Sequence, residues 1–290
     1  MASSPVLVLC PGAFGGPDGF NKLLPFLSEA GIATQPGGYP SCNPPDPTQA
    51  TCAADIAHLR DNVLLPILDQ QQRDVVLLAH SYGGVVGGAA SKGLDKQTRA
   101  AQGHPTSIIG LIYVAGNITL EGESLLEAVG GAYPPFIKLN KVCVCVCSTP
   151  HAPPRAPPQN PSQSAGTKAV PKPSPNVALI EPHMDILYND CDASQAAALG
   201  QAMAPHANLA FETKPSAPGW ADAGFDAGRR VYVRTRDDCC NPASLQDVWL
   251  AKSQVRWEVV DFQSGHMPFV SRPEALAAQI VTSVRGFVAL

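Results

Sequence analysis

Ten residues, VVLLAHSYGG at positions 75–84, constrain the fold of this chain more than any other stretch. Five apolar residues are followed at once by His80, Ser81 and Tyr82, and then by two glycines. The apolar run is typical of a strand covered on both faces, and the small residues that follow it are typical of a helix packed closely on a sheet. We therefore predict a strand over 75–79, a helix over 83–93, and Ser81 at the sharp turn between them.

Short apolar runs alternate with longer amphipathic runs at both ends of the chain. This alternation predicts an α/β fold with a doubly wound, mostly parallel sheet and right-handed crossovers. The predicted strands cover 5–10, 75–79, 108–115, 230–234 and 256–262. The predicted helices cover 19–30, 55–71, 83–93, 242–253 and 272–289, and Pro66 is expected to kink the second of them.

The middle of the chain lacks this alternation, and we expect residues 117–227 to form a cap inserted above the sheet. The core is then divided into a first part, 1–116, and a second part, 228–290. Residues 148–176 hold nine of the 29 prolines and only three charged side chains, which predicts a disordered loop at about 142–176. The run VCVCVC at 142–147 is compatible with a strand. It is also compatible with a translated intron, because a GT repeat in DNA can encode alternating Val and Cys.

Composition argues against several classes of partner. The formal net charge is −4 and charged residues make up 15% of the chain, so there is no basic patch for nucleic acid or an anionic membrane. No apolar run reaches the roughly 18 residues that span a bilayer. The N-terminus has no basic region before its apolar run, so we expect no secretory signal and a cytoplasmic location. The nine cysteines lack the spacing of a zinc site, and we expect free thiols and no metal. The sequence leaves the oligomeric state open.

The segment from Ala79 to Gly83 fits the pattern G-x-S-x-G, except that alanine replaces the first glycine. In this pattern a serine stands at a strained turn between a strand and a helix. Small residues two positions to either side let the backbone turn sharply, which lifts the serine hydroxyl clear of the sheet. Ser81 is therefore a candidate nucleophile, provided that a base lies beside it.

Candidate partners for Ser81 follow two later strands. Asp237 and Asp238 come after the strand at 230–234, and His266 comes after the strand at 256–262. The carboxyl ends of neighbouring parallel strands meet in one crevice, so these side chains can reach Ser81. We predict that His266 accepts the proton of Ser81 and that one aspartate orients the imidazole. The spacing alone does not decide between the two aspartates.

An oxyanion formed at Ser81 needs hydrogen-bond donors. The helix after Ser81 offers the backbone N–H of Tyr82, and the loop after the first strand offers that of Ala13 or Phe14. The neighbouring His80 is expected to have a packing or hydrogen-bonding role. Surface or core roles are expected for the remaining histidines, His58, His104, His151, His183 and His206.

The chain resembles the α/β-hydrolase superfamily, and specifically the small fungal serine hydrolases related to plant methylesterases and hydroxynitrile lyases. The matching pieces span 5–290 apart from 142–176 and read PGAFGGPDGFNKLLPFLSEAGI, VVLLAHSYGG, GLIYVAGNITLEGESLL, ILYND, YVRTRDDCCNP and SGHMPFVSRPE. In that family the acid commonly reads T-x-x-D-x-x-x-P, which Thr235, Asp238 and Pro242 match, so the resemblance assigns the acid to Asp238. It also implies that no cofactor is needed and that a helical cap selects the substrate.

These features favour a hydrolase that cleaves a carboxylic ester or lactone through an acyl-enzyme on Ser81. The cap has few charges, which favours a small, uncharged and mostly apolar substrate. The related hydroxynitrile lyases cleave a carbon–carbon bond and carry a lysine directly after the catalytic histidine, where this chain has Met267. Met267 argues against such a lyase, but three alternatives stay open: a hydroxynitrile-lyase-like carbon–carbon lyase, a non-catalytic small-molecule binder on the same fold, and an inert product of a faulty gene assignment if 142–176 keeps the cap from closing.

Overall fold

The computed structural model describes residues 4–139, 176–226 and 228–290, and its core is one six-stranded sheet. Every neighbouring pair of strands in this sheet is parallel. The strands, in spatial order, are β2 (Ala33–Pro36), β1 (Val6–Cys10), β3 (Val75–His80), β4 (Ile108–Val114), β8 (Arg230–Thr235) and β9 (Glu258–Phe262). The predicted α/β sheet is confirmed. The alternation missed β2, a short edge strand that ends in a proline and is buried only in part.

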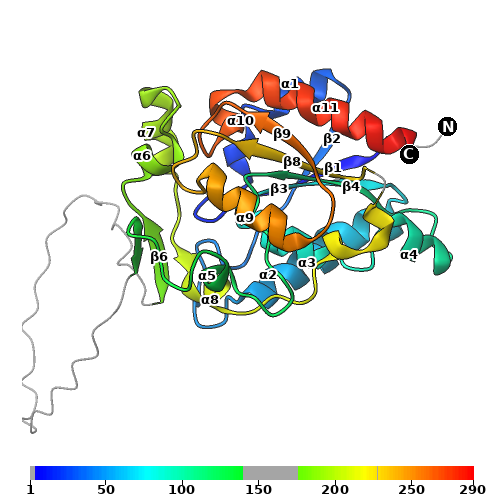
Figure 1. Ribbon diagram of the computed structural model, residues 1–290, viewed down its shortest axis with the longest axis horizontal. Coiled ribbons are helices and arrows are strands. Elements are labelled where there is room, and N and C mark those ends of the chain that lie inside the picture. Colours follow the sequence, from blue (N-terminus) through cyan, green and yellow to red (C-terminus); the bar gives the residue numbers. More distant parts are fainter. Residues whose placement is uncertain (1–3, 140–175, 227) are drawn as a thin grey trace, which may run out of the picture.

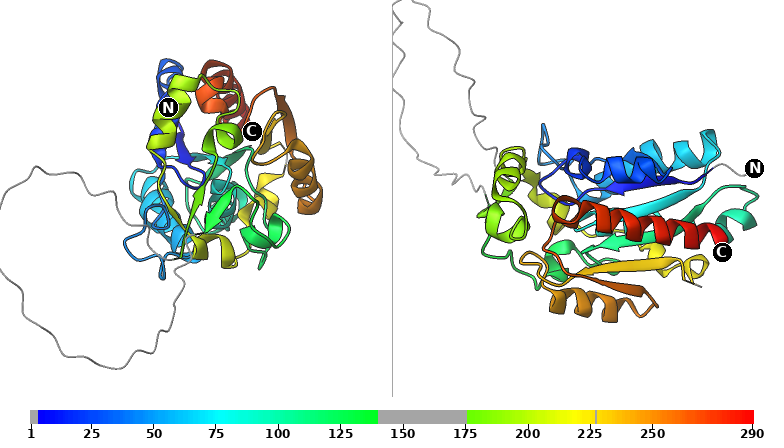
Figure 2. Two further views of the ribbon diagram at one scale, coloured as in Figure 1. Left: turned by 90° about the vertical axis from the view of Figure 1, so that its left-hand side faces the viewer. Right: turned by 90° about the horizontal axis from the view of Figure 1, so that it is seen from above.

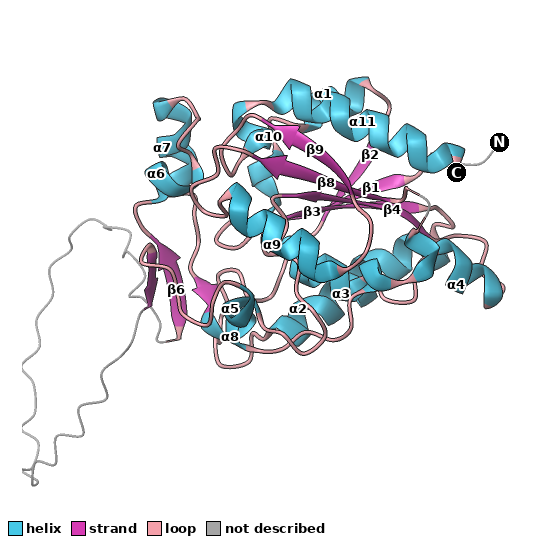
Figure 3. Ribbon diagram, in the orientation of Figure 1, coloured by secondary structure: helices cyan, strands magenta, loops and turns pink. Residues whose placement is uncertain are grey.

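Helices cover both faces of the sheet (Figures 1 and 3). One face carries α1 (Leu24–Glu29) and α11 (Pro273–Ala289), and the other carries α2 (Cys52–Leu59), α3 (Gly83–Ala90) and α9 (Ala243–Ser253). Gly110 of β4 lets α11 lie close, because a Cβ there would come within 2.1 Å of the Phe287 ring. Shorter elements complete the core: η1 (Pro17–Phe20), α4 (Lys96–Ala101) and α10 (Pro268–Ser271).

The helix predicted over 55–71 continues past α2 as two π-helical turns, η2 (Arg60–Leu64) and η3 (Pro66–Gln70). Pro66 has no N–H to donate within a regular helix, and it stands at the first position of η3. The proline therefore changes the hydrogen-bond pattern of the helix at the predicted position.

The strand order reverses at one point of the sheet. From β1 the chain crosses to β2 on one side and then returns to form β3 on the other side of β1. The loops that leave the carboxyl ends of β1 and β3 therefore diverge, which opens a crevice at this end of the sheet. Ser81 directly follows β3, and residues 11–16 follow β1. The topology thus brings both predicted parts of the site to the same place.

Most of the segment between β4 and β8 lies at the end of the sheet toward which the strand arrowheads point (Figures 1 and 2), whereas its last part, at 219–225, packs beside α3 and α4. It contains an antiparallel sheet of β5 (Ile137–Leu139), β6 (Val177–Ile180) and β7 (His206–Ala207). Its helices are α5 (Leu125–Ala128), α6 (His183–Leu187), α7 (Ala193–Gln201), α8 (Asn208–Glu212), η4 (Gly219–Ala221) and η5 (Ala223–Phe225). The cap therefore adds a small sheet to the helices that were expected. Apart from Asn176, the predicted loop at 142–176, with its VCVCVC run, lies outside the described residues.

Two general expectations, about membrane spans and about cysteines, can be compared with the described part of the chain. None of its helices is long and apolar enough to cross a membrane. Its cysteines are all unpaired, namely Cys10, Cys42, Cys52, Cys191, Cys239 and Cys240.

Candidate active site

Ser81 adopts a strained backbone conformation at the turn between β3 and α3. Its φ is 51°, a left-handed value that costs a residue other than glycine about 1–3 kcal/mol. Two glycines make the turn possible. A Cβ on Gly83 would lie 2.4 Å from the carbonyl oxygen of Cys10, and one on Gly84 would lie 2.4 Å from that of Asn117. The backbones on both sides press against the turn, so Ser81 is held in the conformation that its sequence pattern predicts.

The loop after β1 lies against Ser81. A Cβ on Gly12 would be 3.0 Å from the Cβ of Ser81 and 2.8 Å from Nδ1 of His80. Of the two donors that the sequence left open, Phe14 has its N–H engaged already, because it donates to Nδ1 of His206 over 3.4 Å. Ala13 is therefore the better placed donor of this loop. Both Ala13 and Tyr82 line the same cavity as Ser81.

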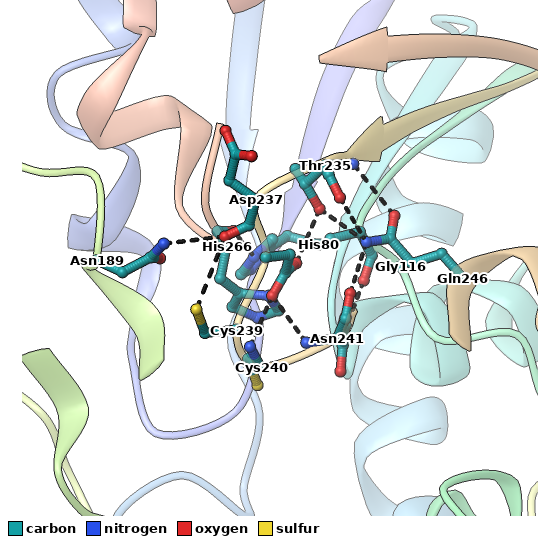
Figure 4. A network of polar contacts seen from close by, with 12 residues as sticks. His80, Gly116, Asn189, Thr235, Asp237, Cys239, Cys240, Asn241, Gln246 and His266 are labelled. Carbon is teal, nitrogen blue, oxygen red and sulfur yellow. Dashed lines mark hydrogen bonds and ion pairs between the residues drawn. The ribbon is translucent and has the colours of Figure 1, made fainter. Parts of the chain in front are cut away.

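His266 forms a buried pair with Asp238. Its Nδ1 lies 2.8 Å from Oδ2 of Asp238, and both side chains are almost fully inaccessible to solvent. Asp237 is placed differently: its carboxylate accepts the side-chain amide of Gln263 and points away from His266 (Figure 4). Geometry therefore pairs His266 with Asp238, the residue that the family motif assigns.

Asp238 accepts four hydrogen bonds. Its Oδ1 accepts the backbone N–H groups of Cys240 and Asn241, at 2.8 and 2.7 Å. Its Oδ2 accepts the Thr235 hydroxyl at 2.8 Å in addition to the imidazole. Each oxygen thus has two donors, and the carboxylate has one orientation in which all four are satisfied.

The side chains of Gln246 and Asn241 hold the loop that carries Asp238 in place, and Figure 4 shows them beside Thr235. Gln246 donates to the hydroxyl of Thr235 at 2.9 Å and to the carbonyl of Asn241 at 2.6 Å. The side chain of Asn241 in turn donates to the carbonyl of Ala115 at the end of β4. The loop after β8 is therefore tied to its own strand, to α9 and to the neighbouring strand.

His80, the residue before Ser81 in the chain, contacts His266. Its Nε2 donates to the carbonyl of His266 over 3.0 Å, and the two rings lie 4.7 Å apart between centroids. Burial, followed by the charge of His266, holds the pKa of His80 well below its usual range. A neutral His80 has the hydrogen-bonding role that the sequence suggested for it. Among the hydrogen bonds of the described residues, none joins Ser81 directly to His266.

The pKa of His266 lies well above its usual range of about 6.5. Burial by itself lowers this pKa, but the negative charge of Asp238 and the neighbouring Cys240 thiol more than offset that effect. The imidazolium form is thus stabilised by the group that also orients the ring.

The cavity beside Ser81 has a volume of about 280 Å³. The cap contributes most of its apolar wall, and its lining contains no Asp, Glu, Lys, Arg or His. Aromatic side chains form one part of the wall, namely Phe14, Tyr133, Phe136 and Phe211. Of its polar residues, Ser81 and Tyr82 follow β3, and Asn117, Cys240 and Asn241 come from loops that follow β4 and β8. The cavity is suited to an uncharged, largely apolar molecule.

A comparison with known families agrees with this arrangement. The model of the Alpha/beta hydrolase family matches residues 7–279. The chain belongs to this family. Alpha/beta hydrolase nvfD of Aspergillus novofumigatus (strain IBT 16806) is 22% identical to it over 279 residues, with 95% of each chain covered.

Solved structures similar to this hydrolase include esterases. A pyrethroid hydrolase from Sphingobium faniae JZ-2 superposes with a TM-score of 0.66 at 18% identity, covering 99% of this chain and 100% of the other. A methylesterase from Arabidopsis gives 0.64 at 18% identity, with 97% and 99% covered. A polyneuridine aldehyde esterase gives 0.65 at 16% identity, with 98% and 100% covered. At these identities the likeness concerns the fold.

The hydrolase contains a second group of Ser, His and Asp side chains. Oγ of Ser41 lies 2.5 Å from Oδ2 of Asp55 and 2.9 Å from Nε2 of His206. Here the serine stands between the other two residues, whereas in a nucleophilic triad the histidine does. Ser41 and His206 are both fully buried and do not line the cavity. Ser41, unlike Ser81, therefore has no access to a substrate in the cavity.

Sequence reasoning found the parts of the site that follow strands, and it missed the parts that support them. Asn241 and Gln246 carry no motif of their own, although both lie within a few residues of Asp238. Ser41 and Asp55 lie 14 positions apart, His206 is 165 positions from Ser41, and the three are brought together only by folding. Among the described residues no group of three or more His, Cys, Asp and Glu side chains is arranged to hold a metal ion.

Proposed function

We propose that this protein is a serine hydrolase that cleaves carboxylic esters or lactones through an acyl-enzyme on Ser81. The proposal is carried by a strained Ser81 at the point where the strand order reverses, together with a buried Asp238–His266 pair whose imidazole lies 4.7 Å between ring centroids from His80, the residue before Ser81. Strain of this kind persists only where the surrounding structure maintains it, and it is concentrated at functional sites.

The proposed reaction uses the residues as follows. The hydroxyl of Ser81 attacks the carbonyl carbon of the ester while Nε2 of His266 takes its proton. The N–H groups of Ala13 and Tyr82 donate to the oxyanion. The oxyanion then collapses, the C–O bond to the alcohol breaks, and His266 returns the proton to the leaving oxygen. Water repeats the sequence on the acyl-enzyme and releases the acid and free Ser81. In proteins without substrate the bond between nucleophile and base is often long and tightens when substrate binds.

The cavity supports a small, uncharged substrate with an apolar acyl or alcohol part. A charged group would have to enter a space whose lining residues offer it no opposite charge, at a cost that apolar contacts do not repay. The similar proteins are a pyrethroid hydrolase, a methylesterase and a polyneuridine aldehyde esterase. We propose an ester of comparable apolar character for this chain.

The residue after His266 helps to decide between ester hydrolysis and carbon–carbon cleavage. Met267 is buried and begins the turn into α10. It has no charge with which to receive an anionic leaving group such as cyanide. Ester hydrolysis needs no such charge, because His266 protonates the leaving oxygen. Met267 therefore supports ester hydrolysis over carbon–carbon cleavage.

Labelling with a fluorophosphonate tests the proposal, because this probe reacts with a serine that a neighbouring base activates. We expect labelling of the wild type and none of Ser81→Ala or His266→Ala, while Asp237→Asn, the matched control, is labelled normally. A panel of neutral and anionic p-nitrophenyl esters then tests the substrate class, with preference for neutral esters expected. A folded wild type that is neither labelled nor active on any ester would refute the proposal and favour the non-catalytic binder. Preference for an anionic ester would contradict the substrate class alone.

A further inference from the structure

The backbone of Phe14 is held from two sides by the cap. Its N–H donates to Nδ1 of His206 over 3.4 Å, and its carbonyl accepts the N–H of Ala204 at 2.8 Å. Phe14 has a φ of 65°, which is unfavourable for a bulky residue. The two peptide units that meet at Phe14 therefore keep their direction, because residues from a distant segment bind the N–H of the first, which joins Phe14 to Ala13, and the carbonyl of the second.

The Phe14 N–H determines where the protons of the network lie. Because it is a donor, Nδ1 of His206 accepts and Nε2 carries the ring proton. Nε2 then donates to Oγ of Ser41, and the single hydroxyl proton of Ser41 goes to Asp55. Burial lowers the pKa of His206 to about 3, so the ring stays neutral and keeps this tautomer.

The same network holds the other half of the oxyanion hole. The hydroxyl of Tyr82 donates to Oδ2 of Asp55 at 2.7 Å, and Oδ1 of Asp55 accepts the N–H of Ser41 at 3.0 Å. Burial raises the pKa of Asp55, and these hydrogen bonds from Ser41 and Tyr82 oppose the rise. The side chain of Tyr82 is thus fixed by the residues that, through His206, also fix the backbone of Phe14.

Ring packing supports the arrangement. The imidazole of His206 is stacked on Phe211 with centroids 4.9 Å apart and planes 9° apart, and it meets the ring of Tyr82 edge-on at 5.2 Å. The cap, the loop after β1 and the turn after β3 therefore share one buried contact.

We infer that Asp55, Ser41 and His206 form a positioning network that sets the two halves of the oxyanion hole relative to each other. The inference rests on the proposed function for its catalytic consequence. His206 is its central positioning residue: it touches no substrate and acts through the Phe14 peptide and, by way of Ser41 and Asp55, through Tyr82.

Two substitutions of His206 separate its hydrogen bonds from its packing. His206→Phe keeps a ring over Phe211 but removes the acceptor for the Phe14 N–H and the donor to Ser41. His206→Asn loses the ring but has Oδ1 near the position of Nδ1, so it keeps the acceptor. Ser41→Ala interrupts the link to Asp55 without touching the bond to Phe14, and it serves as a milder variant if His206→Phe does not fold.

The first measurement is amide hydrogen exchange at Phe14, followed by NMR, in the wild type and the three variants. We expect exchange at least 10-fold faster in His206→Phe than in His206→Asn, with Ser41→Ala in between. This measurement needs no substrate and therefore judges the network whether or not the protein cleaves esters. Equal exchange at Phe14 in the wild type and in folded His206→Phe would overturn the inference.

The second measurement determines kcat and KM for a neutral ester and asks which of the two the substitutions change. Misplacing an oxyanion donor weakens binding of the transition state more than binding of the substrate. We expect kcat of His206→Phe to fall about 10- to 100-fold with KM within about twofold of the wild type. The affinity for a trifluoromethyl ketone, which forms a tetrahedral adduct on serine, should fall by a similar factor, and His206→Asn should recover part of both losses. Unchanged kcat together with faster Phe14 exchange would refute the positioning role. Absence of all ester cleavage in the wild type would refute the proposed function instead.

Discussion

Replacing Asp238 by asparagine or alanine should separate its catalytic role from its structural one. In Asp238→Asn one oxygen is kept, and it stays where two backbone N–H donors from Cys240 and Asn241 require an acceptor. The new amide N–H then faces Nδ1 of His266. Since two donors cannot pair, the imidazole changes to the tautomer that is protonated on Nε2 and can no longer accept the Ser81 proton. We expect kcat to fall about 10³- to 10⁴-fold.

The alanine variant differs in stability. Asp238→Ala leaves both backbone N–H groups without their acceptor, at about 1–3 kcal/mol each, so the free energy of unfolding should fall by roughly 2–6 kcal/mol. The asparagine variant keeps those two bonds, and we expect it to lose no more than about 1–3 kcal/mol. Urea unfolding gives the stabilities, and single-turnover hydrolysis of a p-nitrophenyl ester gives the rates.

A matched control is available at the neighbouring position. Asp237→Asn changes an exposed carboxylate whose partner is the side-chain amide of Gln263, and both its activity and its stability should stay close to the wild type. The reasoning is refuted if Asp238→Asn keeps more than a tenth of the wild-type kcat. It is also refuted if Asp238→Ala is as stable as Asp238→Asn, because the two backbone N–H groups would then contribute nothing.

Two further predictions concern pH and the turn at Ser81. A general base must be neutral, and since the pKa of His266 lies above 6.5, kcat/KM should rise with pH through a midpoint above that value, shifted to lower pH in Asp238→Asn. A rise centred below 6.5 in the wild type, measured with a neutral ester at constant ionic strength, would contradict the electrostatic effect of Asp238. In Gly83→Ala the new methyl would lie 2.4 and 2.7 Å from the carbonyl oxygens of Cys10 and Pro11, which are backbone atoms and cannot easily move. We expect fluorophosphonate labelling to be lost or slowed at least about 10-fold, with Gly15→Ala, whose Cβ meets nothing within 4 Å, as the unaffected control.

Much of the core could be predicted because its signals are local. A strand covered on both faces has to be apolar throughout, so β3 and β4 are visible as unbroken runs, and both are buried at every position. The turn at Ser81 is visible because only small residues fit where backbones approach within van der Waals distance. β2 escaped prediction because an edge strand of four residues needs no such run.

What the sequence by itself determined is therefore the α/β class, the order of the strands along the chain, and the identity of Ser81, His266 and an adjacent pair of aspartates. The spacing alone left two aspartates open and the family motif favoured Asp238; the tertiary structure shows that Asp238 is the one that faces the imidazole. It also decided that Phe14 is engaged by His206 and that Ser41, Asp55 and Tyr82 share one buried network. These hydrogen bonds join residues 14, 27 and 192 positions apart, and such spacings leave no periodic pattern in a sequence. They are specified by the packing of whole elements, and that packing exists only in the folded chain.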